Sequence, residues 1–352
     1  MFLKIKKYLF RKFKKLETDV HDLNYLFWEC TTRCNHNCLH CGSDCTKDSS
    51  FPDMPLQDFL KALETIKEKS KFFTVVLTGG EPLLRKDIEK CGQEIRKLGF
   101  RWSMVTNGYL YDKEKHFSLQ NAGLGALTIS IDGMKDSHNW LRNTPNSFKK
   151  VDEAIGLAAT SKRLNFDVVT CVNQKNINEL PEIYDYLIKK GVKAWRLFTT
   201  TPIGRAKNNP DLNLSGQQLK YVMDFITEKR KLKKLDIKFS CEGYVGDYEL
   251  KVRDMFFFCR AGINIGSVLI DGSISACPNI DRSFAQGNIY KDNLFDVWQN
   301  KFSIFRNREW TKTGICKNCR DYKDCMGNGL HYWHGQTKEL IMCHKEKISE
   351  PF

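Results

Sequence analysis

Three cysteines near the start of the chain have the spacing of a metal-binding loop. Cys34, Cys38 and Cys41 form the pattern CxxxCxxC. Three thiolates on one loop can bind three irons of a 4Fe–4S cluster and leave the fourth iron open to a small ligand. Zinc prefers four protein ligands in paired CxxC spacing, so a zinc site here would also need Cys30 or Cys45. The spacing favours iron and sulfur over zinc.

A second set of cysteines lies in the C-terminal third of the chain. Residues 241–352 contain seven of the fourteen cysteines and short segments between turns. Six of them are candidate metal ligands: Cys259, Cys277, Cys316, Cys319, Cys325 and Cys343. So little regular structure around so many thiols predicts a small domain organised by metal. The last four would also fit a zinc ribbon that binds nucleic acid, but that interpretation leaves the N-terminal cysteines unexplained.

Alternating strands and helices lie between the two sets. Apolar runs predict strands at residues 23–28, 72–78, 102–106, 126–131, 166–171 and 194–199. Helical periodicity predicts helices near residues 55–70, 86–98, 112–122, 147–161, 176–190 and 215–234. This order indicates a parallel sheet with crossover helices. Six units are fewer than the eight of a closed barrel, so we expect an α/β fold, a partial (β/α)6 TIM-like barrel over residues 23–240 with its site at the C-terminal strand ends.

Composition and charge exclude several classes of protein. The chain is 41% hydrophobic and 12% aromatic, which excludes wholesale disorder. Residues 1–15 carry seven lysines and arginines and no acid, half of the net charge of +14. Because this excess is not spread over a folded face, we expect no nucleic-acid partner. Basic residues interrupt the apolar ones, unlike in a signal peptide, so we expect a cytoplasmic protein whose clustered cysteines do not form disulfides.

Residues 1–22 are predicted to form a basic amphipathic arm ahead of the barrel. Basic and apolar residues alternate over residues 1–18 at a roughly helical period. Such a helix suits a membrane surface, where the protein would be peripheral, or an acidic partner. It would equally suit a helix that caps the barrel and leaves its lysines solvated.

The segment TGGEP, from Thr78 to Pro82, follows the second predicted strand. Together with CxxxCxxC after the first strand, it resembles the radical S-adenosylmethionine (radical SAM) superfamily. The resemblance implies that the open iron binds the amino and carboxylate groups of SAM. It also implies cofactor-binding roles for His40, Gly79, Gly80, Glu81, Asn107, Ser130, Asp132 and Arg142. The chemistry agrees, because paired glycines let backbone approach a ligand and the planar fork of an arginine suits a carboxylate.

The C-terminal cysteines resemble the SPASM domain, an extension of many radical SAM enzymes that carries two auxiliary 4Fe–4S clusters. The resemblance implies that the outer cluster is held by Cys316, Cys319, Cys325 and Cys343. Cys259 and Cys277 would serve the inner cluster, whose third cysteine is replaced here by Gly329. One or two auxiliary clusters are therefore expected.

Three explanations of the missing inner ligand stay open. Cys241 could supply a thiolate, or His331 or His334 could bind iron, as histidine does in some iron–sulfur centres. Alternatively, the inner cluster is absent and its two remaining cysteines are buried thiols.

Two further cysteines, Cys91 and Cys171, are predicted to lie in the hydrophobic core.

The radical SAM resemblance implies a reaction. An electron donor of the flavodoxin or ferredoxin type would drive cleavage of SAM to methionine and a 5′-deoxyadenosyl radical. That radical would abstract hydrogen from a peptide or protein, which is then crosslinked or oxidised. A small metabolite is the alternative substrate. An iron–sulfur electron carrier that no longer cleaves SAM is a further alternative, but the intact cluster and cofactor residues speak against it.

Two further resemblances concern the substrate. Sulfatase-maturing relatives have an aspartate directly after the second SPASM cysteine, and Pro278 at that position argues against sulfatase maturation. The segments at residues 41–45, 259–264 and 327–331 resemble a subgroup associated with lipoprotein-type partners.

Overall fold

A single curved sheet of ten strands organises the molecule in the computed structural model, which describes residues 2–67, 69, 73–240 and 242–349. The order across the sheet is β10-β9-β8-β1-β2-β3-β4-β5-β6-β7. The strands are β1 (Tyr25–Thr31), β2 (Thr74–Gly79), β3 (Arg101–Thr106), β4 (Leu124–Ser130), β5 (Asn165–Val172), β6 (Ala194–Thr199), β7 (Asp236–Phe239), β8 (Ile265–Val268), β9 (Ser273–Ser275) and β10 (Gly287–Asn288). Strands β1 to β7 pair in parallel, which confirms the predicted α/β fold.

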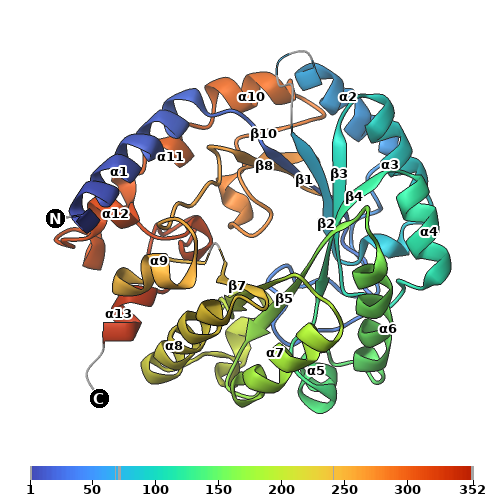
Figure 1. Ribbon diagram of the computed structural model, residues 1–352. Helices are drawn as coiled ribbons and strands as arrows, with labels where there is room; N and C mark the ends of the chain where they lie inside the picture. Colours follow the sequence, from blue (N-terminus) through green and yellow to red (C-terminus); the bar gives the residue numbers. More distant parts are fainter. Residues whose placement is uncertain (1, 68, 70–72, 241, 350–352) are drawn as a thin grey trace.

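Helices follow most of the parallel strands and cover the outer side of the sheet (Figure 1). The helices of this part are α2 (Leu56–Lys67), α3 (Ile88–Lys97), α4 (Lys113–Asn121), α5 (Lys135–Arg142), α6 (Ser147–Thr160), α7 (Leu180–Lys189) and α8 (Gly216–Leu232). The other helices are α1 (Phe2–Val20), α9 (Glu249–Val252), α10 (Leu294–Asn300), α11 (Ser303–Arg306), α12 (Tyr322–Cys325) and α13 (His344–Ser349). Among the described residues, no helix is long and apolar enough to cross a membrane.

The sheet extends beyond the six predicted strands at both edges. At one edge, β7 pairs with β6. At the other, β8 lies parallel to β1, with Tyr25 opposite Ile265, and turns back into the antiparallel strand β9. The C-terminal region thus contributes strands to the same sheet, which sequence patterns missed because these strands have only two to four residues. Of the predicted strand 72–78, Phe72 lies outside the described residues and β2 begins at Thr74.

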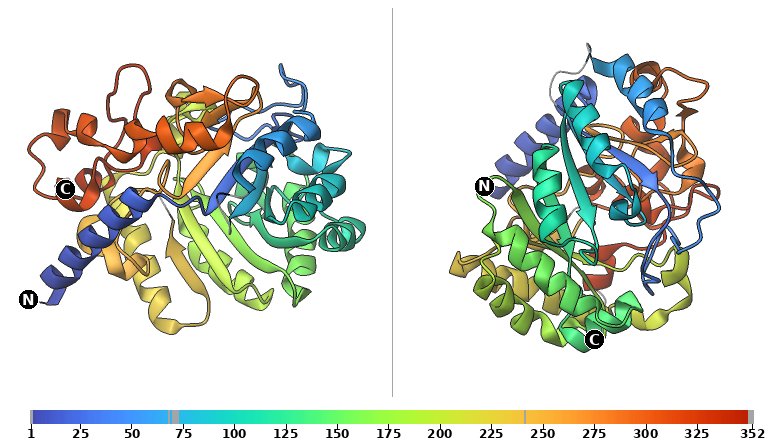
Figure 2. Two further views of the ribbon diagram at one scale, coloured as in Figure 1. Left: turned by 90° about the horizontal axis from the view of Figure 1, so that it is seen from above. Right: turned by 90° about the vertical axis from the view of Figure 1, so that its right-hand side faces the viewer.

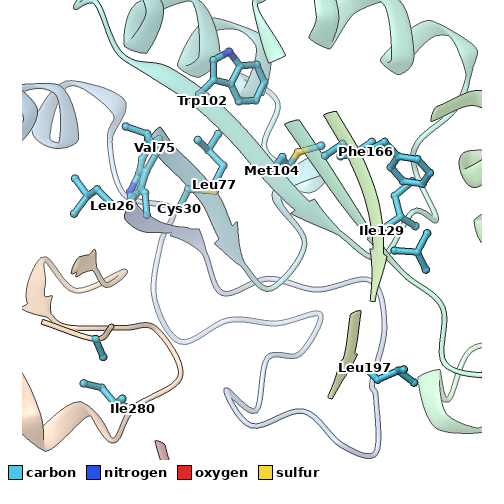
Figure 3. Close-up of a cluster of buried hydrophobic side chains, with 14 of the residues drawn as sticks. Leu26, Cys30, Val75, Leu77, Trp102, Met104, Ile129, Phe166, Leu197 and Ile280 are labelled. Atoms are coloured by element: carbon cyan, nitrogen blue, oxygen red, sulfur yellow. The ribbon is translucent and has the colours of Figure 1, made fainter. Parts of the chain in front are cut away.

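The hydrophobic core lies between the sheet and its helices (Figure 3). Trp28 of β1 stacks on Phe59 of α2 with ring centroids 4.1 Å apart. In β5, buried residues alternate with partly exposed ones, so successive side chains point to opposite faces of the sheet. Cys91 is fully buried, as predicted. Cys171 is not a core residue: it is partly exposed and lies 3.3 Å from the hydroxyl of Thr200 at the end of the sheet where the site forms.

Candidate active site

The loop after β1 holds Cys34, Cys38 and Cys41 close together. Burial, together with smaller contributions from Glu81 and the neighbouring thiols of Cys38 and Cys41, raises the pKa of the Cys34 thiol to about 12. The loop is anchored by two hydrogen bonds: Cys34 N donates to the carbonyl of Thr46 (2.8 Å), and Arg205 Nε donates to that of Cys38 (2.8 Å). Three thiols close together on one loop fit a cluster ligand set, because metal binding converts thiols to thiolates even where burial raises their pKa.

The other two cysteines of this region differ in position. Cys30 is buried in the core and donates to the carbonyl of Thr78, whereas Cys45 lies beside Cys41 and its thiol lowers the pKa of Cys41 to about 6. No group of three His, Cys, Asp or Glu side chains among the described residues converges on a point that would hold a single metal ion. The ligands of a 4Fe–4S cluster do not have to converge on one point, because each thiolate binds a different iron.

The segment Gly79 to Glu81 follows β2 and packs directly against the start of the cysteine loop. Gly80 N donates to the carbonyl of Thr31 and Glu81 N to that of Arg33, both at 2.8 Å. A Cβ at Gly79 would overlap the carbonyl oxygen of Thr31, and one at Gly80 would overlap that of Arg33. The two glycines are therefore required for two backbone segments to lie side by side.

We expect Gly80→Ala to destabilise the fold by roughly 3 kcal/mol, because rigid backbone cannot move away from the new methyl group. Gly156→Ala is the matched control: Gly156 lies within α6, and an added Cβ meets nothing within 4 Å. There the substitution should stabilise by about 0.5–1 kcal/mol through helix propensity. Urea unfolding of both variants measures the difference. Equal stabilities would contradict the argument.

Glu81 connects the ends of β2 and β3. Its carboxylate is fully buried and accepts hydrogen bonds from Thr106 Oγ1 (2.7 Å), Asn107 N (2.8 Å) and Leu83 N (3.1 Å). The side-chain amide of Asn107 in turn donates to Asn35 in the cysteine loop (2.8 Å). A carboxylate offers about four acceptor positions, so three internal donors leave one for a ligand. Binding of the SAM amino group by Gly79, Gly80 and Glu81 stays a prediction.

Asp132 and Arg142 form a buried ion pair directly behind the cysteine loop. Arg142 Nη2 lies 2.5 Å from Asp132 Oδ2, and Nη1 lies 3.7 Å from the sulfur of Cys38. The backbone N–H of Cys171 donates to Asp132 Oδ1 (2.7 Å). The guanidinium holds the pKa of Asp132 below its usual range despite burial. Arg142 Nε is buried without a hydrogen-bond partner, so the site retains an unused donor for an anionic group such as the SAM carboxylate.

One cavity of about 720 Å³ collects four of the predicted cofactor residues: His40, Ser130, Asp132 and Arg142. His40 Nδ1 is buried without a partner, and burial lowers the pKa of this imidazole to about 4. Gly79, Gly80, Glu81 and Asn107 are not among the lining residues. They lie beside the cysteine loop, where Gly80 N and Glu81 N donate to the carbonyls of Thr31 and Arg33 and the Asn107 amide donates to Asn35.

The same cavity extends to the predicted inner-cluster residues. Cys259, Cys277 and His331 all line it. A Cβ on Gly329 would lie 2.6 Å from both His331 Cε1 and the carbonyl oxygen of Glu242, so a cysteine does not fit there. His331 Nε2 is buried without a partner. The imidazole thus fits as replacement for the missing thiolate, whereas Cys241 lies outside the described residues.

We expect His331→Ala to lower the iron content by about four per chain after anaerobic reconstitution, because the inner cluster loses its third ligand. His334→Ala is the control, since His334 borders the same cavity but is exposed. Pulsed EPR of the reduced wild type should show nitrogen coupling that disappears only in His331→Ala. Full iron content in both variants, with no nitrogen coupling, would contradict this assignment.

The four predicted outer-cluster cysteines come together at a second cavity, of about 490 Å³. It is lined by Cys316, Cys319, Cys325 and Cys343 among other residues. Cys325 accepts a hydrogen bond from the backbone N–H of Asn328 (3.1 Å), as cluster thiolates commonly do. These four cysteines, spread over 28 residues of the chain, therefore lie together in space, and their role as cluster ligands stays a prediction.

Glu242 is a buried acid that sequence analysis did not identify. It borders the main cavity just beyond β7, and its Oε2 accepts hydrogen bonds from Tyr332 OH and from Thr199 Oγ1 (3.1 Å). His344 Nε2 lies 3.1 Å from the same threonine hydroxyl. Burial raises the pKa of Glu242 to about 7. No motif surrounds Glu242, so only the position beside Cys241 could have drawn attention to it.

Two family models match the chain. Residues 28–187 match the Radical SAM superfamily, and residues 259–320 match SPASM, an iron-sulfur cluster-binding domain. The chain belongs to the radical SAM superfamily. This radical SAM enzyme carries a SPASM domain, and its cofactors are SAM and 4Fe–4S clusters, as the resemblance of its motifs implied.

Similar proteins differ in their activities. The chain is 25% identical over 333 residues to the AdoMet-dependent heme synthase of Nitratidesulfovibrio vulgaris, covering 89% of each chain. It is 26% identical over 311 residues to the mycofactocin maturase MftC of Mycolicibacterium smegmatis, covering 86% of this chain and 76% of that one. The structure of anSMEcpe with bound AdoMet and Cp18Cys peptide has the same fold, with a TM-score of 0.71, 20% identity and coverage of 93% of this chain and 94% of that one.

Proposed function

We propose that this radical SAM enzyme modifies a peptide or protein by hydrogen abstraction, in a crosslinking or oxidation reaction. The observation that carries the proposal is the pairing of the charged side chains in the cavity wall. Each of the three arginines that border the cavity is paired with a carboxylate of the chain: Arg142 with Asp132, Arg260 with Glu17 and Arg282 with Glu29. Because a carboxylate of the chain already neutralises each guanidinium, these arginines attract a substrate with several carboxylates less strongly than unpaired arginines would.

Part of the remaining wall suits an uncharged group. Phe198, Phe258 and Ile341 contribute apolar surface, and Thr199 to Thr201 contribute hydroxyl and backbone groups. A side chain of an extended peptide needs this combination of apolar contact and a few fixed polar partners. A volume of about 720 Å³ is large enough for SAM and a substrate side chain to share the cavity.

The roles proposed for the chain's own residues follow from their positions. SAM and the cluster supply the radical chemistry. Cys34, Cys38 and Cys41 would hold the cluster, Arg142 would orient the SAM carboxylate and His40 would lie beside the adenine. Glu242 would accept a proton from the substrate, since an acid with a pKa of about 7 suits proton transfer near neutral pH. A flavodoxin- or ferredoxin-type protein would supply the electron.

A tetrapyrrole is the second candidate substrate, a small metabolite. The heme synthase of N. vulgaris favours it, because the match covers 89% of both chains. The mycofactocin maturase and the anSMEcpe peptide complex favour a peptide substrate instead. The paired arginines support the peptide proposal, since a tetrapyrrole carries several carboxylates.

Deuterium transfer from the substrate to 5′-deoxyadenosine distinguishes a peptide or protein substrate from a small metabolite. The reduced enzyme and SAM are incubated with deuterium-labelled host lysate, separated into macromolecular and low-mass fractions, and 5′-deoxyadenosine is analysed by mass spectrometry. We expect deuterium from the macromolecular fraction, with the signal lost after proteinase treatment. Transfer from the low-mass fraction only, or turnover of iron-coproporphyrin III, would overturn the peptide proposal.

A further inference from the structure

Helix α1 is fixed to the C-terminal region through one face only. Arg11 Nε donates to Asp324 Oδ1 (2.6 Å), and Lys7 Nζ lies 3.3 Å from Oδ2 of the same carboxylate. Lys14 is buried and its Nζ donates to the backbone carbonyl of Asp324 (2.6 Å). Phe10 packs on Phe256 with ring centroids 5.5 Å apart. These contacts hold the helix rigidly against α12 rather than over the barrel.

The opposite face of α1 is apolar and exposed. Phe2, Ile5, Leu9, Leu16 and Val20 recur at steps of three, four or seven residues, which places them along one side of a helix. Their exposed fractions are 71%, 49%, 59%, 60% and 51%. A continuous apolar stripe on the outside of a molecule marks a binding surface.

Lysines flank this stripe. Lys4, Lys6, Lys12 and Lys15 are all exposed. Lys6 Nζ lies 4.5 Å from the ring centroid of Phe2 and Lys12 Nζ 5.6 Å from that of Tyr8, so their stems run along the apolar rings. Three cations point inward and meet Asp324. In contrast, Lys6 and Lys12 border the stripe on its two sides, and Lys4 lies exposed farther round the helix.

We propose that the outer face of α1 binds the surface of an anionic lipid bilayer. The apolar stripe would enter the boundary between headgroups and acyl chains, with the lysines at the level of the lipid phosphates. The helix lies at the periphery, and its N-terminal end projects from the molecule (Figure 2). A second copy of the chain is a poorer occupant, because a symmetric contact would bring the two rows of lysines together.

Because α1 is held by Asp324, binding would orient the whole enzyme at the membrane. Helix α12 contains Asp324 and ends at Cys325, one of the outer-cluster residues. The auxiliary-cluster region would therefore lie on the membrane side of the molecule. This inference is independent of the proposed substrate.

Vesicle flotation of the reconstituted holoenzyme tests the proposal. We expect binding to vesicles of phosphatidylcholine with about 30% phosphatidylglycerol, weak binding to pure phosphatidylcholine, and loss of the preference at about 1 M salt, where the Debye length is about 3 Å. Leu9→Glu should lower partitioning about tenfold or more, because it places a charge in the apolar stripe. Replacing Lys4, Lys6 and Lys12 by glutamine should remove the preference for anionic lipid.

Phe117→Glu is the matched control, since Phe117 is 55% exposed but lies on α4, away from α1. It should bind vesicles as the wild type does. Iron content and 5′-deoxyadenosine release should be unchanged in all variants, which shows that they fold. Partitioning unaffected by Leu9→Glu would overturn the proposal. So would a dimer or a protein complex that Leu9→Glu dissociates while the wild type binds no vesicles.

Discussion

Replacing Cys38 by alanine is expected to abolish the release of 5′-deoxyadenosine from SAM, by at least about a thousandfold, or about 4 kcal/mol. Cys38 lies between the other two loop cysteines in sequence and contacts Arg142 through its sulfur. Its loss removes a cluster ligand and one partner of the guanidinium proposed to orient SAM. The measurement is 5′-deoxyadenosine per chain under anaerobic conditions with dithionite, together with the iron content, which should fall by about four.

Cys91→Ala is the control for this experiment. Cys91 is also buried, but it lies in α3 within the core and away from the cysteine loop. Its replacement should cost about 1 kcal/mol of stability through lost packing and leave SAM cleavage intact. Undiminished 5′-deoxyadenosine release by Cys38→Ala, or equal losses in both variants, would contradict the role assigned to the loop.

The cluster loop and the outer cysteines could be predicted from the sequence because their members are close in the chain. Cys34, Cys38 and Cys41 span eight residues, so their spacing alone restricts how they can meet. The order of strands and helices likewise follows from local periodicity. Residues at strand ends, such as Ser130 and Asp132, could then be placed at one edge of the sheet without knowledge of any contact.

Features that depend on long-range contacts could not be predicted. The pairing of β8 with β1 joins residues some 240 positions apart through four pairs, too few for any pattern to show. Cys171 was assigned to the core because its strand is apolar, but alternation of faces in β5 turns it toward the cavity. The steric conflict that a Cβ at Gly329 would have with His331 appears only in three dimensions, as does the network around Glu242.

The second large effect is expected at Glu242, whose raised pKa must weaken the fold at neutral and alkaline pH. In the unfolded chain this carboxyl ionises near pH 4.5, whereas in the folded protein it stays protonated up to about pH 7. Between about pH 4.5 and pH 7 the folded protein therefore binds one proton more than the unfolded chain. The free energy of unfolding falls as pH rises through this range. A difference of about 2.5 pKa units corresponds to about 3 kcal/mol, fully lost above pH 7.

Glu242→Gln removes this titration and should abolish most of the pH dependence. Relative to wild type, the stability of the variant in urea unfolding should rise by about 2–3 kcal/mol between pH 5 and pH 8. Glu228→Gln, on the exposed side of α8, should follow the wild type at both pH values. If Glu242 accepts the substrate proton, Glu242→Gln will still release 5′-deoxyadenosine but form little modified product. A difference in stability between Glu242→Gln and the wild type that does not change with pH would show that the Glu242 carboxyl ionises normally. Glu242 would then be a poor proton acceptor near neutral pH.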